Sequence, residues 1–268
     1  MGGAVSVGTS VLATAVAPVL AAGALAGALL GAGGQAAPGG GLPLSGRTVV
    51  LDPGHNPGNF SHPGQINRLV DVGNGRKACN TTGTATADGY TEAVFNLDVA
   101  RRAEAILRAA GATVVLTQDG DRPWGPCVTE RAAIATRAHA DAAVSIHADG
   151  APPTGYGFQV ILPAVVVAGT VDTRPIVGPS RRLGLALRSA FGASTGEARS
   201  TYLGRGTALT VRGDLGGLNL STVPAVFIEC GNMANPTDAG RMTTPAWRES
   251  AARGIAAGIS SYLEHPAG

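Results

Sequence analysis

Four side chains that lie far apart in the sequence could together build a catalytic metal site: His55, Glu92, His147 and Glu229. Imidazole nitrogens and carboxylate oxygens are zinc ligands, and catalytic zinc sites use three protein ligands and one open position. Two histidines and one glutamate match that donor set. The remaining carboxylate, Glu229, could then act as the general base toward a water molecule.

The spacing of these residues carries little information, because the intervals are 37, 55 and 82 residues. No His-Glu-x-x-His pattern occurs, which excludes a zincin helix. Taken singly, His55 could be a loop histidine, and Glu92 a first-turn carboxylate favoured by the helix dipole. His147 and Glu229, however, each end an apolar run. Because an unpaired buried carboxylate is costly, these two residues favour a functional site.

The elements that must position these residues are strands alternating with helices. Apolar and β-branched runs predict strands at residues 47–51, 112–117, 142–146, 157–162, 207–211 and 223–228. Helical periodicity predicts helices at residues 91–110, 129–138, 179–191 and 245–264, with Thr91 as an N-cap. Residues 56–89, rich in Gly, Asn and Thr, are expected to form a long loop.

This alternation favours an α/β three-layer sandwich with a mixed, mostly parallel central sheet flanked by helices. His55 follows the first predicted strand, and His147 and Glu229 follow two later ones. In open α/β sheets the carboxyl ends of the strands carry the functional groups. We therefore expect the candidate residues to converge on one edge of the sheet.

Charge divides the chain after residue 46, because all 20 Lys and Arg and all 18 Asp and Glu residues follow it. Residues 4–34 are apolar and long enough to cross a membrane as a helix, and residues 32–37 resemble a signal-peptidase site. We expect residues 1–46 to be an export signal or anchor followed by a Gly/Pro-rich tether. Residues 47–268 are expected to form the catalytic domain, in a protein exported to the periplasmic or cell-wall space or secreted.

Composition excludes several other classes of protein. With 44% hydrophobic residues the chain can build a core, and with 4% aromatic residues and a net charge of +2 it does not fit a stacking-type nucleic-acid binder. Ser194 lies in a Gly-x-Ser-x-Gly motif, but the motif follows a predicted helix rather than a strand. The only later histidine is His265 in the terminal tail, which argues against a serine hydrolase.

Three cysteines allow one disulfide and leave one thiol. Cys79 and Cys127 lie in Gly/Pro/Thr-rich segments, whereas Cys230 lies in an apolar run. Given export to an oxidising compartment, we expect a Cys79–Cys127 disulfide and a buried free thiol at Cys230.

Four sequence blocks, in order, resemble the zinc-dependent N-acetylmuramoyl-L-alanine amidases of the Amidase_3 family. They are Val-Val-Leu-Asp-Pro-Gly-His ending at His55, Glu92 with the following Asn-Leu pair, Arg131 with the run ending at His147, and Val-Phe-Ile-Glu-Cys-Gly-Asn around Glu229. The resemblance covers Arg47 to Leu263. It implies that two histidines and Glu92 bind Zn²⁺ and that Glu229 is the catalytic acid/base. The cysteine-containing loop resembles the actinobacterial branch.

The resemblance implies hydrolysis of the amide bond between N-acetylmuramic acid and L-alanine of the peptidoglycan stem peptide, in cell-wall remodelling or turnover. Peptidoglycan or muropeptide fragments are the expected partners of a monomer that contacts membrane only through an uncleaved N-terminal segment. Two alternatives stay open: a non-catalytic muropeptide-binding regulator, and a zinc peptidase acting within the stem peptide. Asn56, Ala93 and Asp149 depart from the residues usual in the family, and these departures concern the substrate cleft.

Overall fold

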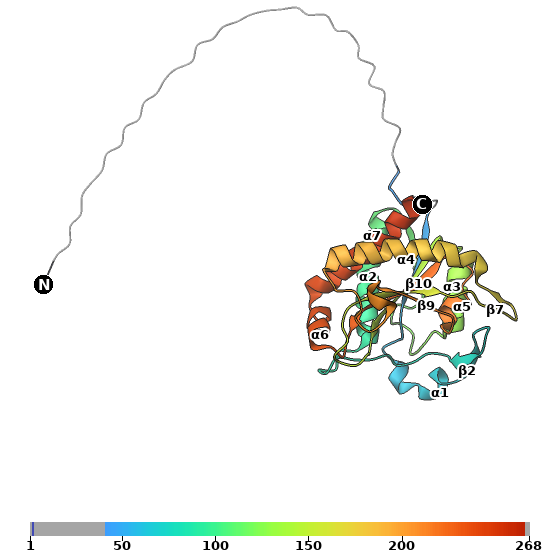
Figure 1. Cartoon of the computed structure of the whole chain (residues 1–268), viewed down its shortest axis with the longest axis horizontal. Helices are drawn as coiled ribbons and strands as arrows, with labels where there is room; N and C mark the ends of the chain where they lie inside the picture. Colours follow the sequence, from blue (N-terminus) through green and yellow to red (C-terminus); the bar gives the residue numbers. More distant parts are fainter. Residues whose placement is uncertain (1, 3–40, 266–268) are drawn as a thin grey trace, which may run out of the picture. The chain divides into compact units, whose positions relative to one another are not determined.

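A six-stranded sheet forms the centre of the computed structural model, which describes residue 2 and residues 41–265 (Figure 1). Its strands are β1 (Thr48–Pro53), β4 (Thr113–Leu116), β5 (Ala142–Asp149), β6 (Gln159–Pro163), β9 (Leu209–Arg212) and β10 (Ala225–Asn232). Their order is β4-β1-β5-β10-β6-β9, and every neighbouring pair is parallel except β10 with β6. The predicted mixed, mostly parallel sheet is confirmed.

Helices cover both faces of this sheet and make three layers. The helices of one face are α2 (Glu92–Ala109), α4 (Arg174–Thr195) and α7 (Pro245–Glu264), and those of the other are α3 (Val128–Arg137) and the short α5 (Gly216–Asn219) (Figure 1). Successive side chains of a strand point to opposite faces of the sheet, so one strand contributes to the hydrophobic clusters on both faces. Val49 and Leu51 pack in the larger cluster with α2, whereas Val50, between them, packs in the smaller cluster with α3 and α5.

The helices form where the sequence places one apolar face and a stop signal. In α2, Phe95, Val99 and Leu107 are fully buried. Gly111 has φ +98°, which ends the helix in a conformation that favours glycine. Helices α7 and α4 pack closely at Gly258, where an added Cβ would lie only 2.6 Å from the Cα of Leu187. The close approach of the two helices therefore requires glycine at this position.

Smaller elements surround the rim of the sheet. They are the hairpins β2 (Leu69–Asp71)–β3 (Arg76–Ala78) and β7 (Val167–Ala168)–β8 (Val171–Asp172), the helices α1 (Pro63–Ile66) and α6 (Pro236–Met242), and the 3-10 turns η1 (Asn59–Ser61) and η2 (Gly204–Gly206). Residues 56–89 thus contain local structure that the absence of periodicity did not predict.

Several predicted boundaries were wrong by a few residues. Strands β5 and β10 run past the expected ends, so His147 and Glu229 lie within strands rather than after them. Helix α4 starts at Arg174 and contains Pro179. Thr91 precedes α2 with an extended backbone, but its side chain makes no capping hydrogen bond.

The predicted export segment and residues 36–40 of the tether fall outside the described residues. Residues 41–46 are described, and Leu44 among them is fully buried and donates its backbone N–H to the carbonyl oxygen of Ala110. The division at residue 46 stays a prediction. Within residue 2 and residues 41–265, no helix combines the length and the apolar character that a bilayer crossing requires.

Candidate metal centre

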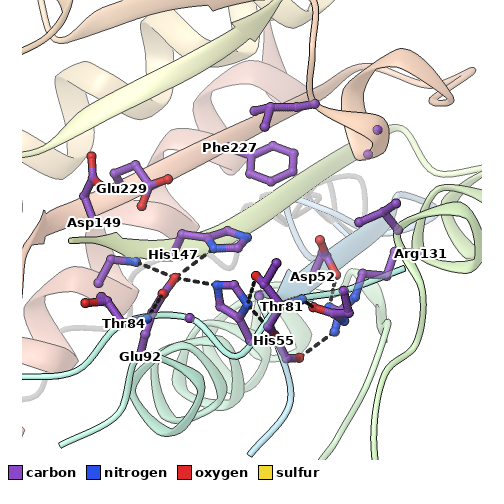
Figure 2. Close-up of a pocket in the computed structure, with 18 of the residues that line it drawn as sticks. Asp52, His55, Thr81, Thr84, Glu92, Arg131, His147, Asp149, Phe227 and Glu229 are labelled. Carbon is purple, nitrogen blue, oxygen red and sulfur yellow. Dashed lines mark hydrogen bonds and ion pairs between the residues drawn. The ribbon is translucent and has the colours of Figure 1, made fainter. Parts of the chain in front are cut away.

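Two imidazoles meet on one carboxylate oxygen at the carboxyl edge of the sheet (Figure 2). Nε2 of His55 lies 3.0 Å from Oε1 of Glu92, and Nδ1 of His147 lies 2.9 Å from the same oxygen. One ligand atom from each residue lies within 4.8 Å of the others. The expected convergence of the three candidate ligands is therefore observed, and their donor set is one that Zn²⁺ accepts.

The Glu92 carboxylate is buried and depends on these contacts. Its side chain starts in the first turn of α2, and Oε2 accepts a hydrogen bond from the backbone N–H of Thr84 at 2.9 Å. Burial alone would raise the pKa of Glu92, but hydrogen bonds from His147 and His55 lower it below its ordinary value. The carboxylate is thus held in its ionised form, which is the form in which a glutamate can bind a metal ion.

His55 is fixed on both sides of its ring. Its backbone has φ +63°, a conformation that non-glycine residues rarely adopt and that turns the chain sharply after β1. Nδ1 lies 3.0 Å from the carbonyl oxygen of Thr81 and 3.1 Å from its hydroxyl. These contacts leave Nε2 directed at Glu92.

Asp52 lies three residues before His55 in sequence, but its carboxylate makes no hydrogen bond to the imidazole. Its carboxylate instead pairs with Arg131 of α3 and accepts hydrogen bonds from Thr117 and Ser145. Arg131 donates in turn to the carbonyl oxygen of His55. Asp52 therefore supports the histidine loop through a buried guanidinium.

Glu229 lies opposite His147 in the parallel pairing of β10 with β5, and its side chain is half-buried. Burial and the neighbouring carboxylates of Glu92 and Asp149 raise the pKa of Glu229 well above its ordinary value. A carboxylate with a raised pKa is a stronger proton acceptor than an ordinary glutamate, which suits an acid/base group.

All four residues line one cavity of about 510 Å³, within the range of small-ligand pockets. The Phe227 ring stacks on that of His147 with centroids 5.1 Å apart and also lines this cavity. Sequence reasoning missed Phe227, Thr81 and Thr84 as parts of the site, and no periodicity or motif marks them. Arg131 was noted only as part of a sequence block that resembles the Amidase_3 family.

Two further expectations concern residues outside the cavity. Cys79 and Cys127 form a disulfide, and Cys230 is buried and free. Ser194 lies in the last turn of α4, where its hydroxyl donates to the carbonyl oxygen of Ser250. This position agrees with the argument against a serine hydrolase.

The chain is a three-layer α/β sandwich whose His–Glu–His cluster, in a cavity at the edge of the sheet, could hold a metal ion. More specifically, the chain belongs to the family Amidase_3, N-acetylmuramoyl-L-alanine amidase, whose model matches residues 49–261.

Mycobacterial amidases are among its relatives. The chain is 36% identical over 221 residues to N-acetylmuramoyl-L-alanine amidase Rv3717 of Mycobacterium tuberculosis, covering 82% of this chain and 88% of that protein. The crystal structure of the amidase Ami1 from Mycobacterium smegmatis matches with TM-score 0.75 and 42% identity, over 82% of this chain and 98% of that one. Ami1 from Mycobacterium abscessus matches with TM-score 0.75 and 39% identity, over 82% and 100%.

Proposed function

We propose that this protein is a zinc-dependent N-acetylmuramoyl-L-alanine amidase that acts on peptidoglycan or muropeptide fragments. It cleaves the amide bond between the lactyl group of N-acetylmuramic acid and L-alanine of the stem peptide. The observation that carries the proposal is the meeting of His55 and His147 on one oxygen of Glu92, beside the carboxyl group of Glu229.

In this proposal His55, Glu92 and His147 hold the zinc ion. Zinc bound there supplies a Lewis acid for the amide carbonyl and makes water more acidic. The Glu229 carboxylate accepts a proton from the attacking water at an Oε atom. It then delivers that proton to the departing alanine amine, since one residue serves both steps. The Phe227 ring, stacked on that of His147, forms an apolar side of the site.

Export fits this function, because the substrate lies outside the cytoplasm. The uncharged apolar segment at residues 4–34 and the Cys79–Cys127 disulfide both support export. We propose residues 1–46 as signal or anchor plus tether, and residues 47–268 as a catalytic domain that works as a monomer.

A muropeptide digest tests the proposal. The zinc-loaded protein is incubated with purified peptidoglycan, with and without a chelator, and soluble products are identified by mass spectrometry. Intact stem peptides that begin with free L-alanine, released only without chelator, are expected. Shortened stem peptides would indicate a peptidase instead, and binding without products would indicate a regulator.

A further inference from the structure

A second group of charged residues, Arg212, Asp214 and Lys77, also lines the cavity. Nε and Nη2 of Arg212 donate to the two Asp214 oxygens at 2.8 and 2.6 Å. Nζ of Lys77, the chain's single lysine, donates to Asp214 Oδ2 at 2.9 Å. Two cations share one carboxylate, so this group carries one excess positive charge.

Arg212 shares a face of the sheet with the candidate acid/base. Phe227 of β10 pairs with Ile161 of β6, which pairs with Thr210 of β9. Residues two apart in a strand project on the same face, so Glu229 lies on the side of Phe227 and Arg212 on the side of Thr210. This face of the sheet therefore extends continuously from Glu229 to Arg212.

The guanidinium of Arg212 keeps binding capacity toward the cavity. Asp214 occupies Nε and Nη2, whereas among residues 41–265 no hydrogen bond is made by Nη1. The Arg212 side chain is 39% exposed. Asp214 holds the guanidinium in place. Nη1 of Arg212 stays available to donate to a planar anion such as a carboxylate.

Two groups of charged residues line the cavity. One is acidic and consists of Glu92, Asp149 and Glu229, and the other is Arg212 and Lys77 with Asp214. Zinc bound at the cluster would offset the acidic group, and the excess positive charge of Arg212 and Lys77 attracts an anionic group of the ligand. On the sugar side of the scissile amide the substrate offers hydroxyl and acetamido groups, which are neutral. Only the peptide side offers carboxylates.

We propose that Arg212, assisted by Lys77, binds a free carboxylate on the residue that follows L-alanine in the stem peptide. This inference rests on the proposed function and extends it from the bond that is cut to the peptide that is preferred. It predicts that amidation of this carboxylate weakens recognition, because a carboxamide cannot form the charge-assisted pair.

A matched pair of substrates tests the inference. N-acetylmuramoyl-L-alanyl-D-glutamate with its γ-carboxyl blocked as the N-methylamide and its α-carboxylate free is compared with the same γ-methylamide as the α-carboxamide, using the zinc-loaded full chain. The wild type is expected to show kcat/KM about tenfold higher for the carboxylate. In Arg212→Gln this ratio falls to about one, and in Arg212→Lys, which keeps the charge, it is partly retained.

Arg174→Gln is the control, because Arg174 makes a comparable ion pair with Asp172 and does not line the cavity. This variant keeps the wild-type ratio. Equal rates for both substrates in the wild type, or an unchanged ratio in Arg212→Gln, would overturn the inference.

Calorimetric binding of the two corresponding dipeptides, each with its γ-carboxyl blocked as the N-methylamide, separates the inference from the proposed function. If the wild type cleaves neither substrate, the proposed function fails. A binding preference for the carboxylate peptide that Arg212→Gln abolishes then still supports the anion site, and equal binding of both peptides overturns it.

Discussion

His147 and Glu229 occupy directly paired positions on the neighbouring parallel strands β5 and β10. Backbone pairing therefore sets the distance between a candidate metal ligand and the candidate acid/base, with no flexible loop between them. They are 82 positions apart in sequence, and the chain between them contains β6, the β7–β8 hairpin, α4, η2, β9 and α5. Groups carried by regular elements keep their geometry better than groups on loops.

The first prediction concerns Glu229→Gln. The amide has nearly the same shape but cannot accept the water proton, so stem-peptide release should fall by roughly 10²- to 10⁴-fold. Zinc content should be unchanged, because Glu229 is not one of the three clustered donors. Product release is measured by mass spectrometry and zinc by elemental analysis. Glu264→Gln, at the exposed end of α7, is the control. Full activity in Glu229→Gln contradicts the assignment.

His55→Ala should behave differently, because it removes a donor from the cluster. The buried Glu92 carboxylate also loses one of its two imidazole partners. Both zinc content after dialysis and hydrolysis are expected to be lost. His265→Ala, at the C-cap of α7, should keep both. Zinc retained at one equivalent in His55→Ala would show that this residue is not a ligand.

The fold could be predicted because its signals are local. Apolar runs gave the six sheet strands, and their alternation with amphipathic segments gave the three layers. The ends of β5 and β10 were placed too early, since polar residues follow Ile146 and Ile228. Backbone pairing continues there, because each strand extends beside the other rather than into solvent.

The supporting contacts of the site could not be predicted because they depend on tertiary packing. Thr81 and Thr84 come from a segment without periodicity, and nothing local marks them as partners of His55 and Glu92. Asp52 shows that closeness in sequence does not identify a partner either. It lies three residues from His55 in sequence, yet its partner is Arg131, 79 residues away.

The Asp52–Arg131 pair predicts a pH dependence of stability. Burial alone would raise the pKa of Asp52, but Arg131 and hydrogen bonds from Ser145 and Thr117 lower it below the ordinary value of 3.8. The unfolded chain therefore binds a proton at higher pH than the folded chain. The stabilisation is complete above the unfolded pKa and is lost as pH falls through the folded pKa.

Urea denaturation between about pH 6 and about pH 3 measures this contribution. The free energy of unfolding of the wild type should fall with decreasing pH more steeply than that of Asp52→Asn, which cannot titrate at this position. Asp119→Asn, on the exposed surface, should keep the wild-type slope. Equal slopes for the wild type and Asp52→Asn would rule out the proposed contribution.

Reduction of the Cys79–Cys127 disulfide should destabilise the protein. The bond joins residues 48 apart, and closing a loop of that length reduces the entropy of the unfolded chain by an amount worth about 4 kcal/mol. The double variant Cys79→Ser/Cys127→Ser should lose a similar free energy of unfolding, measured in urea. It should keep its zinc while folded, since the clustered donors include no cysteine. Reductant should lower the denaturation midpoint of the wild type and leave that of the double variant in place. A wild-type midpoint that does not move on reduction would contradict this prediction. It would mean that packing between α3 and the segment around Cys79 holds the two together without the covalent link.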